Sequence, residues 1–302
     1  MNNTPLSTAN YHLPGLFELY DFYKVFLPLF YKHREWFYDS CNIGSLYGAP
    51  EDCLWGGGRA AFGNAPAQDV LALMDEFEIS PRLTFSNSLL RAEHLSDKKC
   101  NKLCGMLAKA KCPGGVILHS DLLAAYLQKN FPELYLVSST TKVLAKFEEF
   151  ESELNRNEFK FVVPDFRLNK AFEKLSILSQ DKKDKVEFLC NECCDIACTQ
   201  RKACYENVSR KNLGQDVAEH LCASPDAAGG YKFSLAMKNP AFIGVHDIAD
   251  KYMPMGFSNF KIEGRGLGSA LVLEFILHYM TKPEYQLNVR EELYLDSMLD
   301  LF

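Results

Sequence analysis

Cysteines gathered in one segment are the strongest chemical signal in the sequence. Of the eleven cysteines, five fall between positions 190 and 204, and a sixth follows after a gap. The six residues are Cys190, Cys193, Cys194, Cys198, Cys204 and Cys222. Thiolates are soft, anionic ligands that suit zinc and iron–sulfur clusters. Because a cysteine alone is usually a small buried side chain, it is the clustering that predicts metal binding.

The spacing favours an iron–sulfur cluster, with zinc or no metal as the alternatives. Zinc ribbons use two separated Cys-x-x-Cys pairs. Cys190 and Cys193 form one such pair, but no second pair follows at that spacing. The Cys194-x-x-x-Cys198 spacing is compatible with a cluster whose other ligands come from elsewhere, and Cys53 is a remote candidate. The remaining cysteines are expected to be structural: Cys41, Cys100, Cys104 and Cys112.

A glycine-rich turn is the second candidate feature. Gly264, Gly266 and Gly268 follow an apolar run and open a helical pattern, so free backbone N–H groups there could bind an anion. The pattern departs from the dinucleotide-binding fingerprint at its last position. The alternative is a tight strand-to-helix turn in which Arg265 pairs with a carboxylate.

Two further candidates lie in other loops. Gly56–Gly58 precede Arg59, and this segment either brings the backbone close to a site, with Arg59 as a cofactor-binding residue, or is a flexible loop. His119 follows an apolar run and could be a general base, although a hydrogen-bonded structural histidine is the commoner role. The H-E-x-x-H and G-x-S-x-G signatures do not occur.

An alternation of short apolar runs and helical segments predicts how these residues are positioned. The expected strands are Ile43–Tyr47, Leu83–Phe85, Gly115–Leu118, Leu134–Val137, Phe161–Val163, Val186–Leu189 and Phe260–Glu263. The expected helices include Ala67–Phe77, Asp97–Lys111, Thr141–Leu154 and Asn169–Leu178. Such alternation implies parallel pairing, and its length suits an α/β fold of the (β/α)₈ TIM-like barrel type, possibly irregular, better than an open sheet. In a barrel the candidate residues, which follow the strands, would meet at one mouth.

The N-terminal region is expected to stand apart from the barrel. Residues 1–12 look like a tail, and an extra aromatic helix follows. Its apolar face has helical spacing and consists of Leu16, Leu19, Tyr23, Phe26 and Phe30. This face is expected to pack on the body, with a protein partner as the alternative. We therefore expect residues 1–39 to form a tail and helix, and residues 40–302 to form a barrel-like domain with its cysteine-rich segment at 190–222.

Composition limits the class of protein. The 302 residues are 47% hydrophobic and 24% charged, which is ordinary for a globular chain. A net charge of −6 does not indicate nucleic-acid binding. The longest apolar runs, such as Ala270–Met280, are too short to cross a bilayer, and the first residues lack a signal-peptide pattern. A soluble, cytoplasmic protein is the default expectation.

Three segments of the sequence resemble the collagenase-like "unassigned" peptidase family. The segment Val186–Tyr205, which contains NECCDIACTQRKACY, resembles that family's strand followed by cysteines. FSNFKIEGR resembles its recurring strand that ends in Lys-Ile-Glu-Gly-Arg, and Ser45–Cys53 (SLYGAPEDC) resembles its early strand followed by a cysteine. Together they span residues 42–280. The neighbouring Cys190 and Cys193, and the aromatic helix, depart from the family pattern.

The resemblance implies a barrel with a cysteine-bound [4Fe–4S] cluster. Members of the family include proteins needed for oxygen-independent hydroxylation of ubiquinone precursors and of RNA bases, thought to use prephenate as oxygen donor. If the family's ligands are carried over, Cys53, Cys194 and Cys198 would bind the cluster. Cys222 is the first candidate for the fourth ligand, and Cys204 and Cys190 are the alternatives. Arg265 would face the pocket and bind a substrate carboxylate.

Three functional hypotheses follow. The first is an iron–sulfur protein that performs or assists hydroxylation of a small anionic, aromatic or nucleobase substrate. The second is a peptidase with a cysteine nucleophile activated by His119. The third is a non-catalytic, cluster-bearing subunit that docks a partner through the Leu16–Phe30 face.

Overall fold

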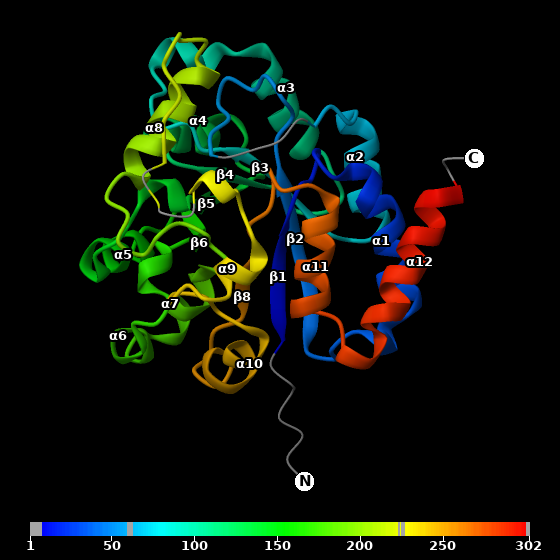
Figure 1. The fold of residues 1–302 in the computed structure, drawn as a ribbon. Coiled ribbons are helices and arrows are strands. Elements are labelled where there is room, and N and C mark those ends of the chain that lie inside the picture. The colour runs from blue at the N-terminus through cyan, green and yellow to red at the C-terminus, as the bar shows by residue number, and fades with distance from the viewer. Residues whose placement is uncertain (1–7, 59–62, 223, 225–226, 300–302) are drawn as a thin grey trace.

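The chain forms a nearly closed barrel of eight parallel strands alternating with helices (Figure 1). The computed structural model describes residues 8–58, 63–222, 224 and 227–299. The strands are β1 (Ala9–Pro14), β2 (Cys41–Gly48), β3 (Ser80–Phe85), β4 (Gly115–Leu118), β5 (Tyr135–Ser138), β6 (Phe159–Val162), β7 (Glu187–Leu189) and β8 (Asn259–Lys261). The predicted TIM-like barrel is therefore confirmed.

The order of the strands follows the chain around the barrel. Each of β1 to β5 pairs in parallel with the next strand, and β8 pairs with both β7 and β1. A parallel bridge between Val162 and Val186 links β6 to the start of β7. Because all strands run the same way, their carboxyl ends share one mouth, where barrel enzymes place their active sites.

Helices surround the barrel; those between strands are crossover connections, and α11 and α12 follow the last strand. They are α1 (Tyr20–Lys32), α2 (Ala67–Glu76), α3 (Lys98–Leu107), α4 (Asp121–Asn130), α5 (Phe147–Leu154), α6 (Phe172–Ser176), α7 (Gln180–Lys185), α8 (Arg201–Asn212), α9 (Phe233–Ala236), α10 (Val245–Asp247), α11 (Ser269–Tyr279) and α12 (Gln286–Leu299). The helix predicted from Thr141 begins only at Phe147, because Val143 has a left-handed backbone conformation (φ 55°).

All seven predicted strands are present within a few residues of their expected ends, but the eighth, β1, was missed. The expectation of a tail is wrong for residues 9–12, because Ala9–Pro14 pairs with both β2 and β8. The pattern hid this strand because its inward-facing His12 is polar. His12 Nδ1 lies 2.8 Å from the Ser45 hydroxyl, so a polar partner inside the barrel allows this polar side chain to be buried.

The aromatic N-terminal helix packs on the barrel. The helix begins at Tyr20, so Leu16 and Leu19 lie in the turn before it. All five residues of the predicted apolar face are buried within the chain, as the first of the two interpretations had it. Phe26 and Phe30 meet Phe37 edge-on or tilted, with ring centroids 6.1 and 4.7 Å apart. Helix α1 also lies beside α12, the last helix of the chain (Figure 1).

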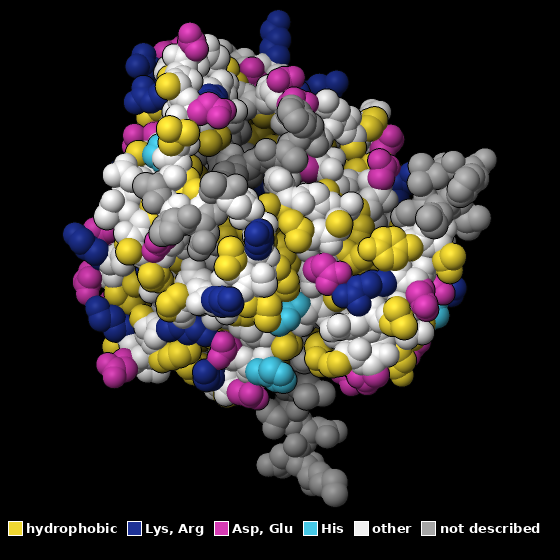
Figure 2. Space-filling model, viewed as in Figure 1, with side chains coloured by type: hydrophobic (Ala, Val, Ile, Leu, Met, Phe, Trp, Pro, Cys, Tyr) yellow, Lys and Arg dark blue, Asp and Glu magenta, His cyan; other side chains and the backbone are white. Residues whose placement is uncertain are grey.

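On the face drawn in Figure 2, acidic and basic side chains are intermixed rather than gathered by sign. In the described part of the chain, no helix is long and apolar enough to cross a membrane.

Candidate functional site

A cavity of about 1000 Å³ opens at the carboxyl ends of the strands. Its floor comes from inward-facing strand residues: Tyr47, Thr84, Ile117, Leu189 and Lys261. Its walls come from the loops that follow β2, β3, β5, β7 and β8. Cavities of this size and mixed lining are typical of small-molecule sites.

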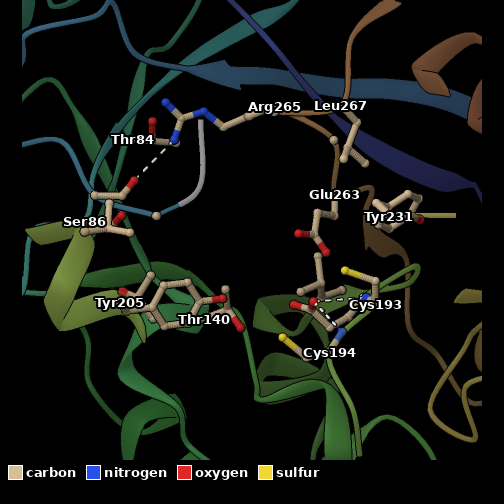
Figure 3. A pocket seen from close by; sticks show the side chains of 18 of the residues that line it. Thr84, Ser86, Thr140, Cys193, Cys194, Tyr205, Tyr231, Glu263, Arg265 and Leu267 are labelled. Carbon is tan, nitrogen blue, oxygen red and sulfur yellow. Dashed lines mark hydrogen bonds between the residues drawn. The ribbon is translucent and has the colours of Figure 1, made fainter. Parts of the chain in front are cut away.

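Four cysteines from three separate segments line this cavity. They are Cys53 after β2, Cys193 and Cys194 after β7, and Cys222 beyond α8. Of the ligands expected from the sequence, the structure thus brings Cys53, Cys194 and Cys222 to one cavity, whereas Cys198 is not among its lining residues. In Figure 3 Cys193 and Cys194 lie beside Glu263, and Arg265, Thr84 and Ser86 line another part of the cavity.

The two alternative fourth ligands lie elsewhere. Cys190 is fully buried at the end of β7, and burial raises the pKa of its thiol well above the usual range. Cys204 is half-buried in α8 and does not line the cavity.

Cys53 has a partner that favours its thiolate. The thiol of Cys100 in α3 hydrogen-bonds to Cys53, and this bond lowers the pKa of Cys53 while raising that of Cys100. A thiolate is the form that binds metals. Cys100 and Cys104 are fully buried, as expected of structural cysteines, but Cys100 also supports the candidate site.

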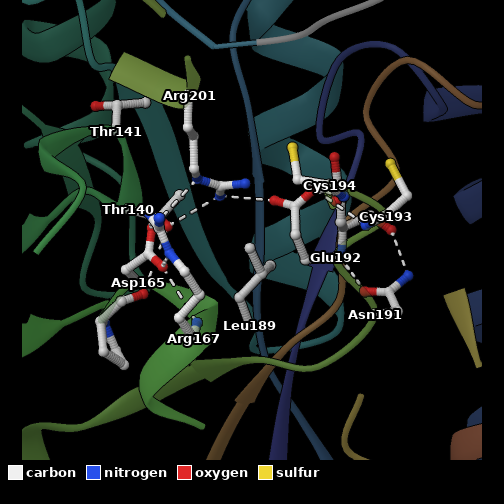
Figure 4. A network of polar contacts seen from close by, with 12 residues as sticks. Thr140, Thr141, Asp165, Arg167, Leu189, Asn191, Glu192, Cys193, Cys194 and Arg201 are labelled. Carbon is white, nitrogen blue, oxygen red and sulfur yellow. Dashed lines mark hydrogen bonds and ion pairs between the residues drawn. The ribbon is translucent and has the colours of Figure 1, made fainter. Parts of the chain in front are cut away.

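A buried ionic network braces the cysteine segment (Figure 4). Arg201 at the start of α8 reaches Glu192 at 2.6 Å and Asp165 at 3.4 Å. One carboxylate oxygen of Glu192 accepts hydrogen bonds from the backbone N–H groups of Cys193 and Cys194, each at 3.0 Å. Glu192 therefore fixes the backbone that carries both cysteines.

Two more side chains hold carbonyl groups of the same segment. Arg167 binds Asp165 through two nitrogens and donates to the Cys198 carbonyl at 3.2 Å. The Asn239 amide donates to the Cys194 carbonyl at 2.9 Å. The loop after β7 is thus tied to the loop after β6, to α8 and to the segment before α10.

Glu192, Cys193 and Glu263 bring their potential ligand atoms within 4.8 Å of one another. Glu192 is already bound by Arg201 and by two backbone amides. We therefore assign it to positioning the cysteines and do not treat this trio as a metal centre.

Arg265 is paired inside the protein. Its Nε donates to Glu18 Oε1 at 2.8 Å, and its Nη1 donates to the Gly57 carbonyl at 3.4 Å. The Glu18 side chain is fully buried and follows β1. The alternative interpretation of the glycine turn predicted that Arg265 pairs with a carboxylate, and Glu18 is that carboxylate. The contacts of Arg265 link the loops after β1, β2 and β8.

The glycine segments lie at the cavity, but with different roles. Gly264 and Gly266 line it, whereas Gly268 lies just before α11 with φ 79°. A Cβ on Gly57 would lie 2.5 Å from the Ser86 backbone, so only glycine allows this close approach. Arg59 lies outside the described residues.

His119 contacts a hydroxyl. Its Nδ1 lies 3.0 Å from Thr141 Oγ1, which in turn lies 3.0 Å from Ser139 Oγ. Burial lowers the pKa of His119 to about 4, and nearby Lys142 and Lys202 act in the same direction. Ser139 and Thr141 line the cavity, but His119 does not.

Sequence reasoning missed a second ionic network, which lies inside the barrel and reaches the cavity floor at Lys261. The Glu187 carboxylate is fully buried and contacts Arg82 at 2.5 Å, Lys261 at 3.1 Å and His12 at 3.6 Å. Burial lowers the pKa of His12 to about 3, so this imidazole is neutral near pH 7. The available signal was an ionisable residue inside each of four strands: His12, Arg82, Glu187 and Lys261.

The pKa values in this network reflect burial opposed by ion pairing. Burial opposes the charge of Glu187, but Arg82, His12 and Lys261 outweigh it and hold the pKa of the carboxyl well below its usual range. Burial lowers the pKa of Lys261 to about 8, with Glu187 opposing this change and Arg82 adding to it.

Comparison with known proteins gives a likeness in fold. No protein-family model and no curated protein matches the sequence. A solved structure described as that of the U32 peptidase Mk0906 superposes with a TM-score of 0.53 over 87% of this chain and 96% of that chain, at 12% identity. This chain therefore shares its barrel fold with a U32 peptidase structure.

Proposed function

We propose that this chain is an iron–sulfur protein of the collagenase-like peptidase family that performs or assists oxygen-independent hydroxylation of a small anionic or aromatic substrate. The observation that carries the proposal is the cavity at the barrel mouth, where cysteines from three distant segments gather. The likeness in fold to a U32 peptidase structure supports the family assignment.

The donor set fits a cluster better than a hard cation. Cys53, Cys194 and Cys222 line the cavity and would hold the group, with Cys198 as the ligand taken from the family resemblance. Cys193 also lines the cavity and is the alternative to Cys198. A [4Fe–4S] cluster bound there would supply one-electron transfer.

The residues around the cysteines have separable roles. Glu192 and Arg201 fix the backbone of Cys193 and Cys194, because their ion pair is buried and specific in geometry. Arg265 and Glu18 hold three mouth loops together. The cavity beside them is lined by apolar side chains, hydroxyls and charged groups, and its basic groups, which include Lys261 and Arg265, suit a small aromatic or anionic molecule.

The first test is the iron and acid-labile sulfide content of protein purified without oxygen. We expect stoichiometric iron and sulfide, lost in Cys53→Ser and Cys194→Ser, and lost in either Cys198→Ser or Cys193→Ser. Cys112→Ala is the matched control, because Cys112 lies at the opposite end of the barrel, and it should keep its iron.

Protein that binds no iron, or only zinc, in reconstitution would contradict the proposal. The peptidase hypothesis would then be tested by digestion of unfolded protein substrates with the wild type and a His119→Ala variant. The contact between His119 and Thr141 gives that hypothesis a hydroxyl rather than a thiol beside the base.

A further inference from the structure

Lys261 is a buried amine that faces the cavity. It ends β8, its side chain is 6% exposed, and it lines the cavity floor. Its Nζ lies 3.1 Å from Glu187 Oε1 and 3.5 Å from the centroid of the Tyr47 ring. The amine is thus held in one place at the bottom of a space large enough for a small molecule.

The ion pairs that this amine and its neighbours make with Glu187 do not balance in charge. Glu187 is the carboxylate in contact with it, but Arg82 shares that carboxylate, and Arg82 is also fully buried. His12 is neutral near pH 7, and Arg265 above is matched by Glu18. If Lys261 is protonated, this network contains two cations and one carboxylate. A buried excess charge is unfavourable, so the network favours either a neutral amine or a bound anion.

An independent feature of the same cavity also indicates a ligand. Thr84 lies on β3 two residues beyond Arg82, is 5% exposed and lines the cavity. Within the described residues, its buried Oγ1 has no hydrogen-bond partner. Buried hydroxyls are almost always hydrogen-bonded, so this one is available to a bound molecule.

We propose that Lys261 forms a Schiff base with a small carbonyl compound that carries a carboxylate, of the α-keto acid class. The neutral amine attacks the carbonyl carbon, a C=N bond replaces the C=O bond, and the carbonyl oxygen leaves as water with the two amine hydrogens. No oxidant or reductant is needed. The ligand's carboxylate supplies the negative charge that the network lacks, and Thr84 can donate to one of its oxygens.

The chemistry suits this location. A lysine becomes nucleophilic when burial and neighbouring cations favour its neutral form. Burial lowers the pKa of Lys261 to about 8, and Arg82 and Arg265 contribute in the same direction. The imine can form without a metal, so the proposal goes beyond the iron–sulfur function and can fail separately from it.

The test is reductive trapping on the full chain. Protein is incubated with pyruvate and cyanoborohydride, digested, and the modified lysine is located by mass spectrometry. We expect modification at Lys261 ahead of all other lysines, with an initial rate that rises with pH around a midpoint near 8. This mapping uses the wild type, so it does not depend on any variant folding. Modification spread over surface lysines, or a rate that rises only around pH 10 or above, would overturn the proposal.

Variants sharpen the test. Lys261→Arg keeps a cation beside Glu187 but cannot form an imine, and should abolish trapping. Lys238→Arg is the matched control, because Lys238 also lines the cavity but is exposed, and trapping should persist. Thr84→Val should slow trapping about tenfold through the loss of one hydrogen bond. Equal trapping in folded Lys261→Arg protein, checked by circular dichroism, would contradict the assignment. Iron-free protein should be trapped as well as loaded protein, which separates this outcome from that of the cluster.

Discussion

Two buried ionic networks lie at different depths of the barrel. The upper one joins Glu192 and Asp165 to Arg201 and Arg167 around the cysteine segment. The lower one joins Glu187 to Arg82 and Lys261 inside the strands. Among these groups, the upper network has two carboxylates for two guanidinium groups, and the lower has one carboxylate for two cations.

The difference indicates different roles. A balanced network with a bidentate arginine has its hydrogen-bonding capacity directed at neighbouring backbone, and here it fixes the cysteine loop. An unbalanced network favours a neutral amine or a bound anion, and here the amine, that of Lys261, faces the cavity. We infer that the upper network positions the cysteines and that the lower network binds, or reacts with, a small molecule in the cavity.

Loss of the shared carboxylate should have the largest effect on stability. Glu187→Gln leaves Arg82 and Lys261 buried without a counter-charge, and breaking a buried pair in this way costs about 3–5 kcal/mol. Glu192→Gln should cost less, because Asp165 remains beside Arg201. Urea unfolding of both variants measures the difference. A smaller loss in Glu187→Gln than in Glu192→Gln would reverse the comparison.

Acid should weaken the lower network first. His12 has a pKa of about 3 in the fold and near 6.5 when unfolded, so the unfolded chain binds more protons between these values. Stability therefore falls as the pH drops from about 6.5 towards 3, by up to about 1.4 kcal/mol per pH unit for this group. Glu187, with its depressed pKa, adds to the loss below its unfolded value of about 4.5. Chemical unfolding at pH 7, 6 and 5 should show a shallower slope in His12→Asn than in the wild type.

Removal of the upper arginine should affect metal binding more than stability. Arg201→Gln leaves Asp165 bound by Arg167 and leaves Glu192 bound to two backbone amides, so we expect a cost of about 1–3 kcal/mol. The iron content of anaerobically prepared protein should fall, because Glu192 loses the partner that orients it. Arg167→Lys is the matched variant for comparison, because it changes an arginine of the same network that binds Asp165 and leaves the pair between Arg201 and Glu192 in place. Unchanged iron in folded Arg201→Gln protein would show that the network does not position the ligands.

The smallest effect is expected at Thr84. Thr84→Val removes a hydroxyl that has no partner within the described residues, so stability should change by no more than about 0.5 kcal/mol. Ser138→Ala is the contrast, because that hydroxyl donates to Glu153 at 2.6 Å, and its loss should cost about 1 kcal/mol or more. Thermal unfolding of the two variants makes the comparison. A large loss at Thr84 would mean that its hydroxyl already stabilises the fold.

Local pattern in the sequence determined most of the fold. Gly115–Leu118 is four apolar residues, and the parallel strand that it predicts is β4, buried throughout. The aromatic face from Leu16 to Phe30 has the 3.6-residue spacing of a helix that packs on the body, and it is buried. The same rules missed β1, because His12 looks polar in sequence and has its hydrogen-bond partners only after β2 and β8 close around it.

The sequence also determined which residues are candidate metal ligands by type, since the clustered cysteines are visible without a structure. The tertiary structure decided which of them meet: Cys53, Cys193, Cys194 and Cys222 share one cavity although up to 169 positions separate them in the chain. It also decided that Arg265 pairs with Glu18 and that Lys261 lies at the cavity floor beside Glu187. The physical reason is that periodicity records which face of an element is buried, whereas ion pairs between distant strands arise only from the closure of the barrel.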